Sequence, residues 1–183
     1  MKISYFKKVK ILLVVYILVI MISCNQSPSS EVEDKSPENK VIFHQSEDMG
    51  KQPWVFDIEE STIDNDNYRK AAWTGEYIQL VYMSLGVGEV IDLELHEDHD
   101  QFIRIEMGKA RVLMGKTKEN LDFDEEVSDD WAILIPAGYW HEVRNIGDSE
   151  LKLYTIYGPP EHPKGTVNRT YEEANVIIIK GDF

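Results

Sequence analysis

The sequence predicts an all-β domain in which antiparallel strands form a double-sheet barrel or sandwich. Short segments rich in β-branched and aromatic residues follow one another closely between residues 77 and 157. Glycines separate these segments, and no long amphipathic helical pattern occurs in the chain. Many short strands with closing turns are typical of closed or double-sheet architectures, which leave few unpaired strand edges.

The predicted elements follow in chain order. Strands are expected at residues 77–85, 89–95, 101–107, 110–114, 132–135, 142–145 and 151–157. Gly108-Lys109 has the size of a tight hairpin turn, and the acidic segment 122–130 is expected to be a solvated loop. Residues 55–58 could add a strand and 61–72 a short helix or ordered loop. Residues 171–174 are expected to form a helical turn and 176–180 an edge strand.

The chain begins with a segment typical of a bacterial lipoprotein signal peptide. Lysines precede an apolar run from residue 11 to 22, and Ser23 is followed by Cys24, the only cysteine. A helix of that length rises ~18 Å, too short for ~30 Å of hydrocarbon. The pattern resembles the signal in which a cysteine is lipidated and becomes the first mature residue. We therefore expect cleavage of residues 1–23 and lipidation of Cys24; the alternatives are an ordinary signal peptide or a short anchor.

Residues 24–40 are polar and contain prolines, so they cannot bury enough surface to order themselves and are expected to be a flexible tether. Residues 41–183 have the size of one domain. Together these segments predict a single domain anchored by lipid in the cell envelope of a bacterium. The expected location is the periplasmic side of the outer membrane or the cell surface.

The charge of the chain excludes one class of partner. It has 19 basic and 33 acidic side chains. Four lysines lie before Cys24, so 15 basic residues remain after cleavage and the formal charge becomes −18. Such a field repels nucleic acids at long range. It also disfavours a polyanionic substrate, unless local charges at the site overrule the sum.

Two stretches place histidines beside glycine-marked turns. Residues 88–108 read GEVIDLELHEDHDQFIRIEMG, and residues 136–147 read PAGYWHEVRNIG. Imidazole, carboxylate and carboxamide groups on converging strands can bind one divalent metal. Along the first stretch Gln101, Ile103 and Ile105 alternate, so they should share the inner face. Arg104 is out of phase with them and is expected to form a surface salt bridge.

These stretches resemble the two motifs of the cupin superfamily. Residues 54–174 also resemble small single-domain bacterial cupins that are grouped with type II mannose-6-phosphate isomerases. The resemblance implies a jelly-roll barrel (a double-stranded β-helix) with short helical or loop extensions, whose ligands point inward. It assigns His96, Gln101 and His141 to ligand positions of the motifs. Asp98 takes the place of the second histidine by count, with His99 as the alternative.

The expected cofactor is a divalent metal, Zn, Mn, Fe or Ni, held by His96, Asp98, Gln101 and His141. The alternative is a metal-free pocket in which the histidines bind a sugar or water. Trp140 is expected at the pocket rim, to stack on a sugar or to cover the core edge. His162, in the proline-rich segment after the last strand, either reaches the cavity or belongs to an ordinary rigid loop.

Two classes of function stay open. One is a metal-dependent enzyme, such as a sugar isomerase or epimerase, in which Glu97, Glu142 or a motif aspartate acts as base. The other is a non-catalytic lipoprotein that binds a carbohydrate or another small molecule in the same pocket. One fold hosts many reactions, so the catalytic residue stays unassigned. The resemblance also implies pairing into homodimers.

Cys24→Ser is expected to abolish fatty-acid incorporation and to leave residues 1–23 attached, because the thiol is the group that is acylated. Radiolabelled fatty-acid uptake and N-terminal sequencing test this. A wild-type chain that carries no label and still starts at Met1 would contradict the lipoprotein assignment.

Overall fold

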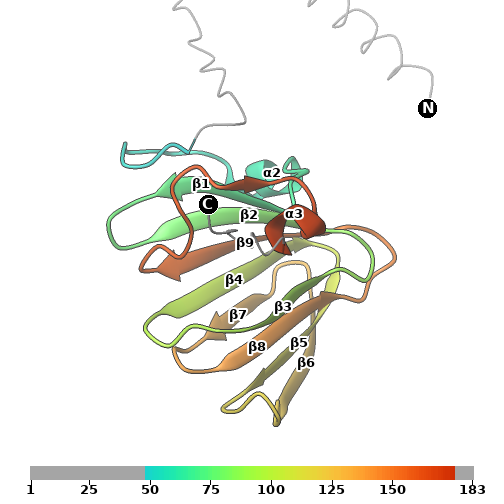
Figure 1. The fold of residues 1–183 in the computed structure, drawn as a ribbon. Helices are drawn as coiled ribbons and strands as arrows, with labels where there is room; N and C mark the ends of the chain where they lie inside the picture. The colour runs from blue at the N-terminus through green and yellow to red at the C-terminus, as the bar shows by residue number, and fades with distance from the viewer. Residues whose placement is uncertain (1–47, 176–183) are drawn as a thin grey trace, which may run out of the picture. The chain divides into compact units, whose positions relative to one another are not determined.

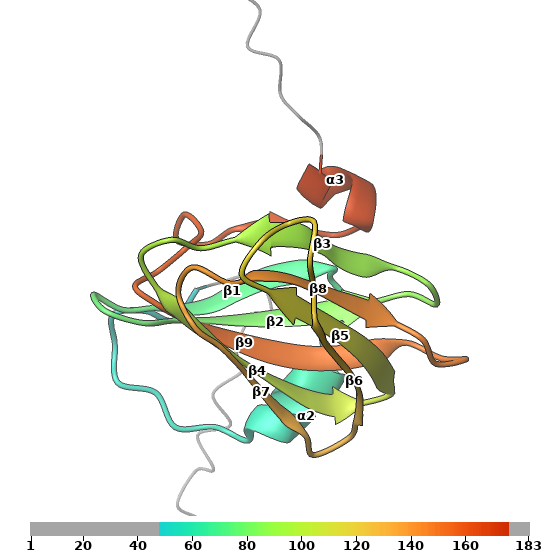
Figure 2. The same cartoon turned by 90° about the horizontal axis from the view of Figure 1, so that it is seen from below.

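The computed structural model describes residues 48–175 and shows two antiparallel sheets packed face to face (Figure 1). In order across the larger sheet lie β10 (Val167–Asn168), β1 (Arg69–Thr74), β2 (Gln79–Leu85), β9 (Leu151–Gly158), β4 (Asp100–Met107) and β7 (Ala132–Ile135). The smaller sheet contains β3 (Val90–Leu95), β8 (Trp140–Asn145), β5 (Lys109–Gly115) and β6 (Phe123–Ser128). Figure 2 looks onto the smaller sheet with the larger sheet behind it. The predicted all-β jelly roll is confirmed.

The core lies between the sheets and becomes polar towards one end. Gln101, Ile103 and Ile105 of β4 are at most 2% exposed, as their alternation predicts. Tyr157 of β9 lies in register with both Gln101 of β4 and Gln79 of β2. These three form a buried row with polar groups at one end of the barrel, whereas the rows beyond them are mainly aliphatic. The fold therefore offers hydrogen-bonding side chains at that end.

The outer face of the larger sheet is covered by the segment that leads into the first strand. Trp54, Phe56 and Ile58 pack on a second apolar cluster that includes Leu80 and Tyr82. Because both of its faces are covered, β2 is buried along its whole length. The short helix α2 (Ile58–Ile63) follows this segment, and its N-terminus is capped by a preceding aspartate.

Several sequence predictions for this region are wrong in detail. Residues 55–58 form no strand, since the chain there packs by side chains and then enters α2. The segment 61–72, predicted to contain a short helix or ordered loop, begins with the end of α2 but belongs to strand β1 from residue 69. The acidic segment predicted as a loop contains edge strand β6, of which only Val127 is buried. Lys109 and Arg111 of β5 form cross-strand ion pairs with carboxylates of β6. These pairs offset the repulsion between the neighbouring acidic side chains of β6.

The predicted hairpin at Gly108 is also wrong. The strands on either side, β4 and β5, belong to different sheets, so the chain crosses from one layer to the other there. Gly108 has φ +98°, and an added Cβ would lie 2.9 Å from the carbonyl oxygen of Glu150. This crossing needs a residue without a side chain.

The helical turn predicted near the C-terminus is confirmed as α3 (Tyr171–Asn175). The hydroxyl of Tyr171 donates to the Asp92 carboxylate of β3 at 2.9 Å. The predictions for the signal peptide, Cys24, the tether and the edge strand at 176–180 lie outside the described residues. Within residues 48–175 no helix has the length and apolar character needed to cross a bilayer.

Gly108→Ala is expected to destabilise the protein by about 2–5 kcal/mol, because left-handed backbone costs ~1–2 kcal/mol and steric overlap ~1–3 kcal/mol. Gly88→Ala is the matched control, since Gly88 has φ +80° with no atom within 4 Å of an added Cβ. Urea unfolding midpoints of both variants test this. Equal losses of stability in the two variants would show that the crossing between the sheets does not require a residue without a side chain at position 108.

Candidate metal centre

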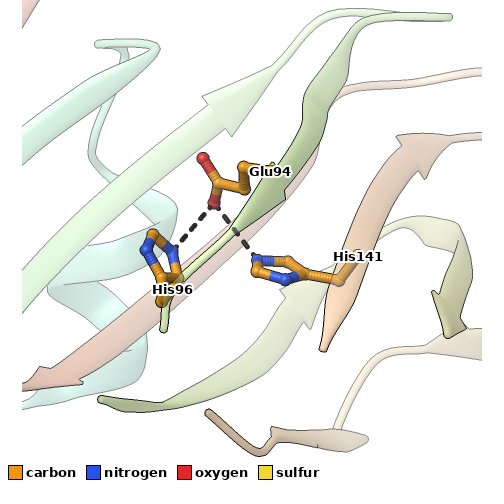
Figure 3. Close-up of side chains that lie close together, drawn as sticks. All are labelled: Glu94, His96 and His141. Atoms are coloured by element: carbon orange, nitrogen blue, oxygen red, sulfur yellow. Dashed lines mark hydrogen bonds and ion pairs between the residues drawn. The ribbon is translucent and has the colours of Figure 1, made fainter. Parts of the chain in front are cut away.

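Strands β3 and β8 bring together a carboxylate and two imidazoles (Figure 3). Glu94 of β3 and His141 of β8 are direct partners in the antiparallel register. His96 follows two residues after Glu94 and therefore presents its side chain on the same side of the chain. The Gly138 amide, in the turn before β8, donates to the His96 carbonyl oxygen at 2.8 Å. Each motif thus holds the other's histidine in place.

The separations of these three groups fit one bound cation. His141 Nε2 lies 3.2 Å from Glu94 Oε1, and His96 Nε2 lies 3.4 Å from the same oxygen. Two ligand atoms each ~2.1 Å from a shared ion, at tetrahedral or octahedral angles, are about 3.0–3.4 Å apart. Little rearrangement is needed for these atoms to share an ion.

The tautomer of His141 suits metal binding. Its Nδ1 lies 3.1 Å from the carbonyl oxygen of Tyr139, which can only accept a hydrogen bond. Nδ1 therefore carries a proton, and Nε2 faces Glu94. A backbone carbonyl in this position is the usual way in which proteins orient a metal-binding histidine. His141 is 0% exposed, so its ring has little freedom to turn away.

The site favours a negative carboxylate beside a positive partner. Burial opposes the charge of Glu94, but the hydrogen bond from His141 and the interaction with His96 outweigh it and lower the pKa of Glu94 to about 2. Burial likewise opposes a charge on His96, yet Glu94 raises the pKa of His96 overall. In this structure the histidine N–H groups stabilise the negative charge of Glu94. A metal cation bound between these side chains would replace those protons and stabilise the same charge.

Two buried polar atoms near this end of the barrel, Gln101 Oε1 and His162 Nε2, have no partner among residues 48–175. His96 Nε2 and His99 Nε2 make no well-aligned hydrogen bond there, although they face carboxylate oxygens at 3.4 and 3.2 Å. More than nine in ten buried polar groups in folded proteins are paired, so Gln101 Oε1 and His162 Nε2 suit an ion, a water or a ligand. The predicted ligand Gln101 donates its amide to Thr155 at 3.0 Å, which leaves its carbonyl oxygen to accept or to bind metal.

A second group of side chains lies beside the first. His99 stacks on His96 with ring centroids 4.4 Å apart. Its Nε2 lies 3.2 Å from Glu161 Oε2, and its Nδ1 lies 2.9 Å from Asp98 Oδ1. Asp98 is 84% exposed and belongs to neither group of potential ligands. The structure therefore brings His96 and His141 together with Glu94 and does not bring Asp98 to them.

Sequence reasoning missed Glu94 although a signal for it was present. Glu94 and His96 are two residues apart, the spacing that keeps side chains on one face of a strand. Counting backwards from His96 would have found the carboxylate. His96 directly follows the last residue of β3 and keeps the strand alternation, whereas Asp98 lies in the bend at residues 97–98, where the alternation no longer holds. Glu161 was missed because only the fold brings its loop back over the barrel.

His162 lies at the cavity wall because its backbone is held there. Gln79, fully buried on β2, donates its amide to the His162 carbonyl oxygen at 2.8 Å and accepts from the His162 amide at 3.0 Å. The imidazole packs edge-on against Tyr157, 5.3 Å between centroids. Burial lowers the pKa of His162 to about 4, so the ring is neutral at pH 7. Trp140, the other predicted rim residue, is partly buried, with the Lys118 ammonium 5.6 Å from its ring.

Comparison with known proteins places these residues in a family context. The profile described as "Cupin domain" matches residues 81–157. The uncharacterized protein YrkC of Bacillus subtilis is 51% identical over 69% of this chain and 68% of its own. The uncharacterized protein L612 of Acanthamoeba polyphaga mimivirus is 43% identical over 72% of this chain and 82% of its own. The crystal structure of BH2720 from Bacillus halodurans has 53% identity and a TM-score of 0.69, covering 70% of this chain and 97% of that one.

His162→Gln is expected to make stability less dependent on pH between about 4 and 6.5. In the wild type the folded pKa lies below the unfolded value of ~6.5. The unfolded state therefore binds more protons in this window, and stability falls as the pH is lowered. Urea unfolding of both proteins at several pH values measures the effect. A difference in unfolding free energy that stays constant with pH would contradict it.

Proposed function

Because the chain belongs to the cupin family, we propose that its barrel binds one divalent metal ion and a small polar ligand beside it. The ligand set is Glu94, His96 and His141, with the carbonyl oxygen of Gln101 as a fourth donor. The observation that carries this proposal is the convergence of Glu94, His96 and His141, within one ligand shell of each other, at a barrel end that holds unpaired polar atoms. Two nitrogen and two oxygen donors suit zinc, manganese, iron or nickel.

The chemistry of the pocket follows from its side chains. Such an ion acts as a Lewis acid that polarises a carbonyl or hydroxyl oxygen. Glu94 contributes the negative charge, and the Tyr139 carbonyl fixes the orientation of His141. Tyr157 and the buried aliphatic rows beyond it keep water out on the side of the site that faces the core. A sugar-like ligand would find hydrogen-bond partners in His162 and Gln101.

In the enzymatic form of this proposal Glu161 is the base, as in an isomerase or epimerase. Of the acids considered from the sequence, Glu142 pairs with Arg144 at 2.8 Å and Asp98 with His99, while Glu97 is exposed and belongs to neither group of potential ligands. Glu161 Oε2 instead faces His99 and lies 3.7 Å from His96 Nδ1. Its side chain is 34% exposed, which leaves it accessible to a bound ligand.

The alternative is a non-catalytic lipoprotein that binds a carbohydrate or another small molecule. One observation favours it: Glu161 is already paired with His99, which suits a recognition group better than a free base. Turnover by the metal-loaded protein that is lost in Glu161→Gln would favour the enzyme, and ligand binding without turnover would favour the binder. In either form the signal-like segment that ends at Cys24 supports attachment to a bacterial membrane.

The decisive test compares Glu94→Ala with Asp98→Ala, two carboxylate deletions four residues apart. Loss of a group that merely orients a ligand costs about 10- to 100-fold in metal affinity, so loss of Glu94 itself should cost at least about 100-fold. Asp98→Ala should change affinity by less than about 10-fold, because that carboxylate only contacts His99. Metal content and cobalt titration of the purified full-length protein measure both, with His96→Ala alongside.

The expected metal affinity also falls as the pH drops through the pKa of His96, which, despite burial of the ring, Glu94 raises above its usual value of ~6.5, because the imidazole must lose its proton to bind. Wild-type protein that binds no divalent ion at pH 7.5 would remove the metal-dependent function. A larger loss in Asp98→Ala than in Glu94→Ala would move the ligand set to the one expected from the sequence.

A further inference from the structure

One arginine points into the barrel without a carboxylate to neutralise it. Arg69 lies on β1 two residues before Ala71, a core residue that is 1% exposed and in register with Val81 of β2. The strand alternation therefore directs Arg69 to the inner face. Its neighbour Lys70 is in register with Tyr82, which belongs to the cluster on the outer face. Arg69 is thus on the cavity side of the sheet.

The guanidinium of Arg69 has no carboxylate partner within the part of the chain that the structure describes. Its Nε is buried without a hydrogen bond, and no ion pair to it occurs among residues 48–175. Its only recorded contact is with the Tyr68 ring, 5.6 Å from the guanidinium carbon to the centroid. The strand arginines on the outer faces behave differently: Arg104, Arg111 and Arg144 all pair with carboxylates.

The charge of Arg69 acts on the wall of the pocket. Burial is the main reason that the pKa of His162 is low, and the positive charge of Arg69 adds to it. Burial raises the pKa of Tyr157, and Arg69 opposes that rise. Tyr157 in turn lies 5.7 Å from His96, ring centroid to ring centroid. Arg69 therefore lies on the inner face of the larger sheet together with Tyr157, and Tyr157 contacts both His162 and His96.

We propose that this pocket takes an anionic ligand, whose carboxylate or phosphate group is bound by the guanidinium of Arg69. Partly buried arginine is suited to this task because its planar N–H groups match two anionic oxygens at once. An unpaired cation inside a protein is costly, so a bound anion would relieve a cost that the fold carries without it. The neutral His162 Nε2 offers a further hydrogen bond.

This inference refines the proposed function, since a ligand fixed at Arg69 can present another oxygen to the metal site. A local positive charge at Arg69 also allows an anionic ligand in a protein whose net charge is negative. The formal charge of −14 repels anions from the surface as a whole, but one partly buried guanidinium on the inner face of the barrel acts on a bound anion at short range, where salt screens less. The predicted specificity is for small acids with one anionic group, not for polyanions.

The test uses two probes of nearly equal size, glycolate and its neutral amide glycolamide, with inorganic phosphate as a third. Calorimetric titration is carried out on the full-length wild type, on Arg69→Gln and on Arg69→Lys. Arg111→Gln is the control, because it removes the same charge from the outer face. Each protein is titrated both with bound metal and after chelation. Near-ultraviolet circular dichroism checks that every variant is folded.

The expected result is that glycolate or phosphate binds at least ~10-fold more tightly than glycolamide, and that Arg69→Gln weakens anion binding about 10- to 100-fold. Arg69→Lys should keep part of the affinity, and Arg111→Gln should match the wild type. The stronger of the two anions identifies the group as carboxylate or phosphate. Equal binding of glycolate and glycolamide, no binding of any anion, or unchanged binding in Arg69→Gln overturns the proposal.

Failure of this proposal is distinguishable from failure of the metal site. Anion binding that depends on Arg69 in the chelated protein would support the pocket even if no metal bound. Metal binding with no preference for anions would leave the metal site intact and remove the role of Arg69. If Arg69→Gln is unfolded, Arg69→Lys still decides, since an unchanged anion affinity together with equal glycolamide binding would contradict the proposal.

Discussion

The antiparallel pairing of β3 with β8 is the constraint on which the candidate site depends. It sets Glu94 opposite His141, and the step of two residues along the chain adds His96. A shift of one residue in this register would turn these side chains to the other face. The hydrogen bond from Gly138 to the His96 carbonyl prevents such a shift at the end where the strand stops. The geometry of the candidate metal ligands is therefore a property of the backbone.

The larger sheet supplies the floor of the same cavity. Gln79, Tyr157 and Gln101 come from three neighbouring strands at one level, and each is at most 2% exposed. A row of this kind costs free energy unless its polar atoms are satisfied. Gln79 is satisfied by the loop that covers it, whereas Gln101 keeps one oxygen without a partner. The contrast separates a structural amide from one that is available to a ligand.

The sequence alone predicted the architecture well because its signals are local. Alternation placed Ile103 and Ile105 with Gln101 inside the barrel, and the glycine-marked turns located most strands. Prediction from the sequence failed where the structure depends on pairing between residues far apart in the chain. Gly108 reads as a hairpin turn, but only the partners of β4 and β5 reveal a change of sheet. Glu161 reads as part of a loop until the fold returns it to His99.

The clamp between Gln79 and the backbone of His162 has an evolutionary consequence. Gln79 recognises the amide and carbonyl of that residue and not its side chain. This part of the attachment of the loop therefore does not depend on which side chain stands at position 162. Related chains could exchange this residue, and with it the chemistry of the pocket wall, without rebuilding the barrel. Diversification of ligand choice within such a scaffold would then proceed by single substitutions in one short loop.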